Sequence, residues 1–218
     1  MTGVQTCALP IFNGDGLQDF AVPLGKNSKG IDNEVRIYLG VNGGQIDSTP
    51  ALVINGFEES LLQARFNGGG DFNGDQLTDI VIGSRNNSEA FIVPGQSGLN
   101  ADSPITCDVS SASDRNTFQV VTVRMIGGSS VQFGAYQDFV GNVLPDGGLL
   151  EYDDVVIGSY GPSGGTAVDS RALIIKGRAS ATGETLIPLS YDHDGSQAAD
   201  DESVLLMADG GKNNFPSD

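Results

Sequence analysis

The chain has 218 residues, and its 28 acidic against 11 basic side chains give a formal net charge of -17 at pH 7. Nucleic-acid binding needs a basic footprint, and anionic membrane surfaces attract basic segments, so the composition argues against both partners. Apolar runs all fall short of the roughly 20 residues of a membrane helix, so we expect no direct membrane insertion in this fragment. The acidity fits calcium sites on an exported surface, and it fits general solubility equally well.

The first eleven residues differ in character from the rest of the chain. They lack a basic n-region and hold few apolar residues, which makes a poor signal peptide. Residues 2–11 are similar to the forward translation of a common sequencing-library adapter. We therefore interpret residues 1–11 as an adapter artefact on a truncated gene, with a genuine but unusual N-terminus as the alternative. Cys7 is then not native, and Cys107 is expected to be a small buried residue rather than a nucleophile.

One nine-residue pattern occurs twice in the sequence. Residues 71–79 read DFNGDQLTD, and residues 11–19 read IFNGDGLQD. In the second copy, oxygen-bearing side chains fall at positions one, three, five and nine. Calcium takes about six to eight oxygen ligands, and alternate residues of a tight loop can converge on one ion. A plain Asn-Gly hairpin turn is the alternative, and the repetition in register favours the metal loop.

An EF-hand is the main rival for such a loop. That motif takes Gly at its sixth position and a bidentate Glu at its twelfth. Gln76 and Ile82 stand at those places in the second copy, and a strand-like apolar run follows the loop. The EF-hand is therefore excluded.

The last acid of the loop marks successive repeats. It occurs at Asp19, Asp79 and Asp154, and residues 209–218 read as a degenerate fourth loop that ends at Asp218. After each marker come short runs rich in Val, Ile and Phe, bounded by turn residues, and the second run ends at a glycine. We expect four strands per repeat and no helix of ten residues or more.

These runs favour an all-β fold in which four-stranded antiparallel sheets pack face to face, as the blades of a β-propeller do. Packing on both faces would explain strands that are almost continuously apolar. Within the second repeat, the third strand is expected at residues 118–123. Within the third repeat it is expected at residues 185–189, and residues 203–207 are expected to lead into the next loop.

The same residues resemble the FG-GAP repeat, the blade of the integrin α-subunit N-terminal head and of many secreted bacterial proteins. The family pattern is a strand ending near Phe-Gly, then Asp-x-Asn-Gly-Asp-Gly-x-x-Asp, then a strand ending in Gly. Residues 66–83 match it best, and Phe133-Gly134 opens the next match. The resemblance covers about residues 12–218, which would hold about three blades of a wheel of roughly seven.

The resemblance implies a calcium ion in each loop. In the second loop it implies the side chains of Asp71, Asn73, Asp75 and Asp79 and the carbonyl of Leu77. In the first it implies Asn13, Asp15, Asp19 and the carbonyl of Leu17, with Ile11 in place of the first ligand. In the third, which carries an insertion, it implies Asp138, Asn142 and Asp154. Val140 stands at that loop's third position, so Asp146, Glu151 or Asp153 could compensate, or the site could be empty.

The function that the resemblance implies is a calcium-binding module of a secreted or cell-surface protein, used in cell adhesion or ligand binding. The expected partner is a protein or carbohydrate on the propeller rim opposite the calcium hairpins. One alternative is a catalytic or non-catalytic part of an extracellular hydrolase or lyase whose active residues lie outside this fragment. Another is a structural spacer. The only histidine, His193, fits a solvated polar turn better than a base, so we favour a non-enzymatic role.

Overall fold

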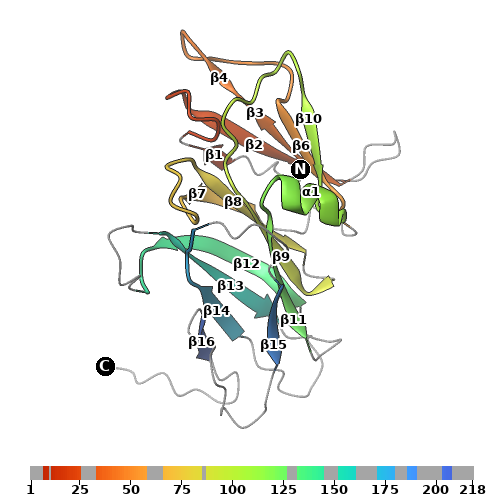
Figure 1. The fold of residues 1–218 in the computed structure, drawn as a ribbon, viewed down its shortest axis with the longest axis vertical. Helices are drawn as coiled ribbons and strands as arrows, with labels where there is room; N and C mark the ends of the chain where they lie inside the picture. Colours follow the sequence, from red (N-terminus) through yellow and green to blue (C-terminus); the bar gives the residue numbers. More distant parts are fainter. Residues whose placement is uncertain are drawn as a thin grey trace, which may run out of the picture.

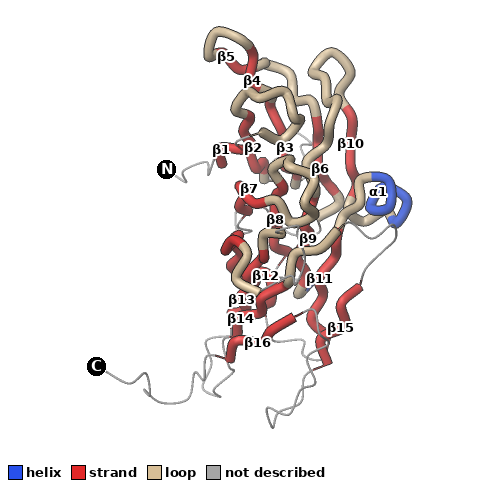
Figure 2. Tube along the Cα trace, turned by 60° about the vertical axis from the view of Figure 1, so that its left-hand side comes forward, coloured by secondary structure: helices blue, strands red, loops and turns tan. Residues whose placement is uncertain are grey.

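Three β-sheets stacked along the long axis of the molecule make up the described part of the chain, as Figures 1 and 2 show from two directions. The structure is a computed structural model, and it describes residues 7–9, 11–25, 33–57, 66–84, 87–126, 132–144, 152–160, 171–179, 186–190 and 203–207.

Each sheet is a meander of antiparallel strands in sequence order, and two of the three carry a further outer strand. The first sheet holds β1 (Cys7–Leu9), β2 (Asp19–Leu24), β3 (Glu34–Tyr38), β6 (Leu52–Asn55) and β10 (Ile105–Asp108). The second holds β7 (Phe66–Gly70), β8 (Asp79–Ser84), β9 (Glu89–Val93), β11 (Val121–Ile126) and β15 (Leu186–Ser190). The third holds β12 (Gln132–Gly141), β13 (Asp154–Tyr160), β14 (Arg171–Ile175) and β16 (Ser203–Met207). A small hairpin of β4 (Gly40–Val41) and β5 (Gln45–Ile46) joins β3 to β6.

The outermost strands of the first two sheets come from the following repeat. β10 pairs in parallel with β6, and β15 pairs in parallel with β11. In each case the chain leaves its own sheet after β9 or β14, adds a strand to the preceding sheet, and returns to its own as β11 or β16. Each later repeat is therefore hydrogen-bonded to the edge of its predecessor.

These crossovers correct two predicted strands. Residues 186–190 do not form the third strand of their own repeat, and residues 203–207 form the outermost strand of the third sheet by pairing with β14. The expectation of four strands per sheet holds only for the third sheet. A short apolar run indicates burial on a pleated surface, but it does not encode which sheet edge the strand will pair with.

The second sheet is buried on both faces. Every residue of β8 and β9 is buried, which confirms the reading of these runs as strands covered on two sides. One face packs against the first sheet through Ile80, Ile82, Phe91 and Val93, and the other packs against the third through Val81, Ala90, Ile92 and Val123. By contrast, β3 and β6 alternate buried and half-buried residues, because only one face of the first sheet has a neighbour in the described structure.

Residues 7–9, part of the segment interpreted as an adapter artefact, form a strand of the first sheet. β1 pairs with β2, with Cys7 opposite Ala21 and Leu9 opposite Asp19. This is the place that β7 and β12 hold in the other two sheets. The adapter origin of the segment stays a prediction, since the pairing of residues 7–9 does not depend on where they come from.

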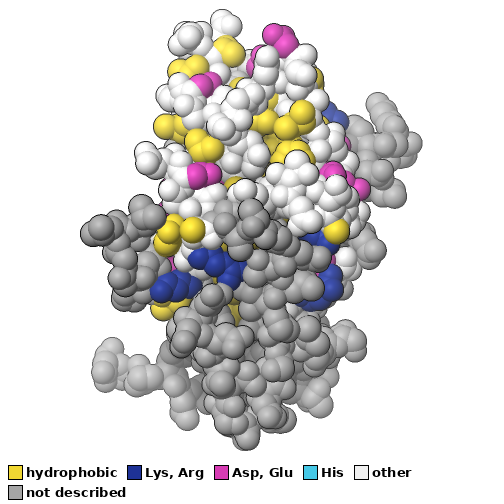
Figure 3. All heavy atoms as spheres, in the orientation of Figure 1, with side chains coloured by type: hydrophobic (Ala, Val, Ile, Leu, Met, Phe, Trp, Pro, Cys, Tyr) yellow, Lys and Arg dark blue, Asp and Glu magenta, His cyan; other side chains and the backbone are white. Residues whose placement is uncertain are grey.

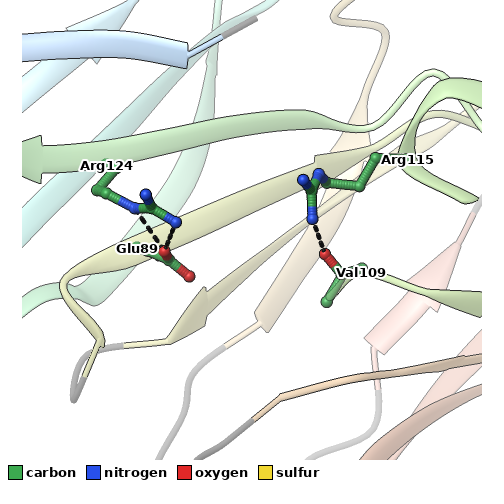
Figure 4. A network of polar contacts seen from close by, with 4 residues as sticks. All are labelled: Glu89, Val109, Arg115 and Arg124. Atoms are coloured by element: carbon green, nitrogen blue, oxygen red, sulfur yellow. Dashed lines mark hydrogen bonds and ion pairs between the residues drawn. The ribbon is translucent and has the colours of Figure 1, made fainter. Parts of the chain in front are cut away.

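The helix α1 (Ala112–Thr117) lies between β10 and β11 and has Ser111 as its N-cap. Arg115 donates to the carbonyl oxygen of Val109 at 2.7 Å, and Arg124 on β11 pairs with Glu89 on β9 (Figure 4). None of the described residues belongs to a helix long and apolar enough to cross a membrane.

Cys107 lies fully buried in the core between the first two sheets. Burial raises the pKa of its thiol to about 12, and the charges of Asp114 and Asp108 act in the same direction. The predicted role of this cysteine as a small core residue is confirmed, because a thiol that stays protonated is a poor nucleophile.

Candidate metal-binding loops

The last acid of each loop is buried. Its carboxylate accepts hydrogen bonds that join the loop to the end of the second strand that follows it. In each case one carboxylate oxygen accepts the N–H of the second loop residue, and the other accepts the N–H of the glycine that follows the second strand. The sets are Asp19 with Phe12 (2.8 Å) and Gly40 (3.0 Å), Asp79 with Phe72 (2.7 Å) and Gly95 (2.8 Å), and Asp154 with Val143 (2.8 Å) and Gly177 (2.9 Å). The markers found in the sequence therefore have a shared structural role.

The glycine after the second strand is required by close approach. A Cβ atom on Gly95 would lie 2.5 Å from the Cβ of Leu77 and 2.9 Å from the carbonyl oxygen of Phe12. A Cβ atom on Gly177 would lie 2.5 Å from the Cβ of Tyr152, which holds the position of Leu77 in the third loop. Only a residue without a side chain lets the loop backbone pass this close.

Inside the second loop, the acidic side chains accept backbone N–H groups. The carboxylate of Asp71 accepts from Gly74 (2.7 Å), Asp75 (3.0 Å) and Gln76 (2.8 Å). Asp75 accepts from the N–H of Leu77 at 2.8 Å and from the amide of Asn73 at 2.9 Å.

In the first loop, the third and fifth residues make the same contacts as the third and fifth residues of the second loop. Asp15 accepts from the N–H of Leu17 at 2.7 Å and from the amide of Asn13 at 2.9 Å. Ile11 stands where the second loop has Asp71, so the first loop has no side chain to accept the three N–H groups that Asp71 accepts.

The charges of the second loop act on its buried acid. The pKa of Asp79 is raised to about 8, chiefly by burial; the N–H donors of Gly95 and Phe72 lower it, and the nearby charges of Asp75 and Asp71 raise it. Burial likewise raises the pKa of Asp19. A cation beside these carboxylates would relieve both the repulsion and the cost of burying a charge.

The donor chemistry of the second loop fits a hard cation, because carboxylate, amide and carbonyl oxygens are the ligands calcium prefers. In this structure, however, the carboxylates of Asp71 and Asp75 accept backbone N–H groups and are not arranged around a common metal position. Among the described residues, no three His, Cys, Asp or Glu side chains lie close enough together to hold a metal ion. Bound calcium would have to displace the N–H groups that the oxygens of Asp71 and Asp75 now accept.

The third loop has a different register from the predicted one. Asp138 lies within β12 opposite Val156, and its carboxylate accepts from the amide of Asn67 on β7. Gly141 lies opposite Asp154, as Gly70 lies opposite Asp79, so Asn142 holds the first loop position and Val143 the second. The structure therefore separates Asp138 from the loop that Asn142 and Asp154 share.

Of the residues suggested to complete the third site, Asp153 is engaged elsewhere. Its side chain accepts the N–H of Asp71 at 2.8 Å, and its N–H donates to the carbonyl oxygen of Asp71 at 2.8 Å. Asp146, Glu151, His193 and the predicted fourth loop at residues 209–218 lie outside the described residues.

A set of contacts between successive loops was missed by sequence reasoning. The first residue of one loop exchanges hydrogen bonds with the residue before the marker acid of the next, which joins Ile11 to Thr78 and Asp71 to Asp153. The carbonyl oxygen of the second residue accepts an N–H from the residue after the next strand-end glycine, which joins Phe12 to Gln96 at 3.0 Å and Phe72 to Arg178 at 2.9 Å. The sequence signal that could have revealed these contacts is that the contacting residues lie at the same offsets from the marker acid or the strand-end glycine in each repeat.

No family model matches the chain, and no curated protein matches it.

On the face drawn in Figure 3, the described acidic side chains are scattered among polar and apolar ones. On the part of that face that the structure describes, the acidic side chains do not form a single patch.

Proposed function

We propose that this chain is a calcium-binding part of a β-propeller from a secreted or cell-surface protein, where it serves adhesion or ligand binding. The observation that carries the proposal is the repeated loop. The loops at residues 11–19 and 71–79 share the same hydrogen bonds of the third, fifth and ninth residues, and they lie at equivalent places on successive stacked sheets.

Bound calcium would hold each loop against the adjacent strand at the edge of its sheet. Asp71, Asp75 and Asp79 place three carboxyl groups within nine residues, and a divalent cation would neutralise them while holding the loop against the strand that follows. A ligand that binds only the folded state stabilises it by mass action. The ion would add to the bond from Asp79 to Gly95, which already joins the loop to the end of β9.

The affinity expected of such a loop suits an extracellular setting. Extracellular calcium modules have dissociation constants of roughly 10⁻⁴ to 10⁻³ M, so the loops would be filled outside the cell and empty in the cytosol. The acidic composition is compatible with this location. Stacked meanders joined at one edge by their loops also support the propeller architecture, in which each sheet would be one blade.

The proposal is tested by calorimetric titration with calcium up to about 10 mM, well above the expected dissociation constants. Asp75→Asn is the informative variant, because Asp75 is exposed and an amide oxygen can still accept the N–H of Leu77. Asp102→Asn is the control, since Asp102 is an exposed acid outside the loops. We expect saturable binding by the unaltered chain and by the control, and loss of binding at the second loop in Asp75→Asn. Titrations without saturable heat, or an unchanged Asp75→Asn variant, would contradict the proposal.

A further inference from the structure

The first and second loops each contain an Asn-Gly pair, and the two pairs have the same local geometry. In both, the Asn side-chain oxygen accepts the N–H of the aspartate two residues on at 3.0 Å, and the amide nitrogen donates to that aspartate's carboxylate at 2.9 Å. The glycines that follow have positive φ values, 82° at Gly14 and 75° at Gly74. The pairs Asn13-Gly14 and Asn73-Gly74 can therefore be compared directly.

The two pairs differ in what meets the N–H of the glycine. In the second loop, the carboxylate of Asp71 accepts the N–H of Gly74 at 2.7 Å. In the first loop, Ile11 holds the position of Asp71, and its hydrocarbon side chain has no atom that accepts a hydrogen bond from Gly14. Gly14 is also exposed, whereas Gly74 is half-buried. The backbone nitrogen of Gly14 thus lacks the carboxylate that holds the nitrogen of Gly74.

This backbone nitrogen is the nucleophile in the deamidation of an Asn-Gly pair, a reaction that makes asparagine thermolabile. After losing its proton to solvent, the nitrogen attacks Cγ of the preceding Asn, and the new C–N bond closes a succinimide ring. The Cγ–Nδ2 bond breaks, and ammonia leaves with its own two hydrogens and one proton from solvent. Water then adds across either C–N bond of the ring, which gives aspartate or isoaspartate. The reaction consumes water, releases ammonia and involves no oxidation or reduction.

Asp71 opposes the first step of this reaction in two ways. Its carboxylate holds the N–H of Gly74 in a hydrogen bond that must break before the nitrogen can turn toward Cγ of Asn73. Its negative charge also disfavours the deprotonated nitrogen, because like charges in close contact repel each other. Exposure of the asparagine alone would favour reaction in the second loop, since Asn13 is buried and Asn73 is half-buried. The two explanations therefore predict opposite orders of reactivity.

We propose that Asn13 is a site of spontaneous deamidation and that Asp71 protects Asn73 from the same reaction. Either product adds a negative charge to the first loop and removes the amide that donates to Asp15. Isoaspartate also lengthens the main chain of the loop by one carbon. The protection by Asp71 requires no calcium, so it is tested apart from the proposed metal binding.

Peptide mapping by mass spectrometry, after incubation of the protein at mildly alkaline pH in EDTA, follows each site separately. Deamidation raises the mass of a peptide, whereas the rearrangement of an aspartate leaves the mass unchanged. We expect Asn13 to deamidate about tenfold faster than Asn73, the factor that corresponds to one hydrogen bond to a charged acceptor. Asn42 and Gly43, which are both exposed on the turn between β4 and β5, supply the rate of an open Asn-Gly pair in the same molecule.

Exchanging the first residue of the loop separates the effect of Asp71 from other differences between the loops. Ile11→Asp supplies the first loop with a carboxylate, and it should slow the reaction of Asn13 about tenfold and leave that of Asn42 unchanged. The reverse exchange, Asp71→Ile, should speed the reaction of Asn73 by a similar factor. Asp71→Ile removes three hydrogen bonds of the loop, so Ile11→Asp, whose side chain makes none, carries the comparison if the former does not fold.

Asp102→Asn is the control for a change of charge, because Asp102 is an exposed acid outside the loops, and it should alter neither rate. The site at Asn13 is overturned if Asn13 keeps its amide while Asn42 loses its own. The protection by Asp71 is overturned if Asn73 reacts as fast as Asn13 in the unaltered chain, or if Ile11→Asp leaves the rate at Asn13 unchanged.

Discussion

The second residue of each loop offers a test in which one position occupies two different environments. Phe72 is enclosed between the second and third sheets and Phe12 between the first and second, whereas Val143 lies open to solvent. Truncating a buried phenylalanine to alanine removes its transfer free energy and leaves a cavity, which together cost about 3–5 kcal/mol. The backbone bonds of Phe72 to Asp79 and Arg178 survive the truncation, so we expect about 3–4 kcal/mol for Phe72→Ala and for Phe12→Ala.

Val143→Ala removes side-chain atoms that are already hydrated, and it should cost less than about 0.5 kcal/mol. The assay is equilibrium unfolding in urea, followed by circular dichroism in EDTA at low protein concentration, so that neither ion binding nor association contributes. The reasoning is refuted if Phe72→Ala costs less than about 1 kcal/mol, or if Val143→Ala costs as much as the two phenylalanine variants.

The remaining predictions concern the second loop. With the pKa of Asp79 raised to about 8, its ionisation costs stability, so the contribution of Asp79 to stability in EDTA should be complete below about pH 4 and should be lost as the pH rises through 8. Asp79→Asn should remove its share of that slope, and it should lower the melting temperature in EDTA as well as in calcium, because an amide nitrogen replaces one of the two oxygens that accept N–H groups; equal slopes for both proteins would show that Asp79 does not titrate as described. Gly95→Ala should cost about 1–3 kcal/mol in urea unfolding, because its Cβ would overlap the loop backbone, and a neutral result would remove the close-approach argument. Gln76 has a φ of 68° where the first loop has Gly16, so Gln76→Gly should raise stability by about 0.5–1 kcal/mol, and a loss instead would mean that the Gln76 side chain makes a stabilising contact.

The sequence predicted the features that repeat at fixed offsets from one marker residue. Asp19, Asp79 and Asp154 were identified from the apolar runs that follow them, and the structure shows all three in the same buried contacts. The strand-end glycines were visible as well. Their physical reason, the passage of the loop backbone over a missing Cβ, depends on contacts between distant residues that no local pattern records.

The third loop shows where this reasoning fails. Its insertion separates the start of the loop from Asp154, so spacing alone could not choose between Asp138 and Asn142 as the first residue. The bulge that places Gly141 opposite Asp154 decides the matter, and a bulge is a property of paired strands.

The crossover strands were missed for a related reason. β15 is a short apolar run like the others, whereas β10 reads ITCD and was not among the predicted strands; the parallel partners of both lie in the sheet of the preceding repeat. Which edge a strand joins is set by the sheets available to it, and hydrophobic pattern fixes the face of a strand but not its neighbour.

The most direct test of the account is the position of calcium in crystals of the protein grown with the ion, located by anomalous scattering. The account predicts a peak inside the second loop, among the oxygens of Asp71, Asn73 and Asp75 and the carbonyl of Leu77, with the carboxylate of Asp71 turned away from the N–H groups of Gly74 and Gln76. A loop with no peak, in which Asp71 still accepts those N–H groups, would contradict it.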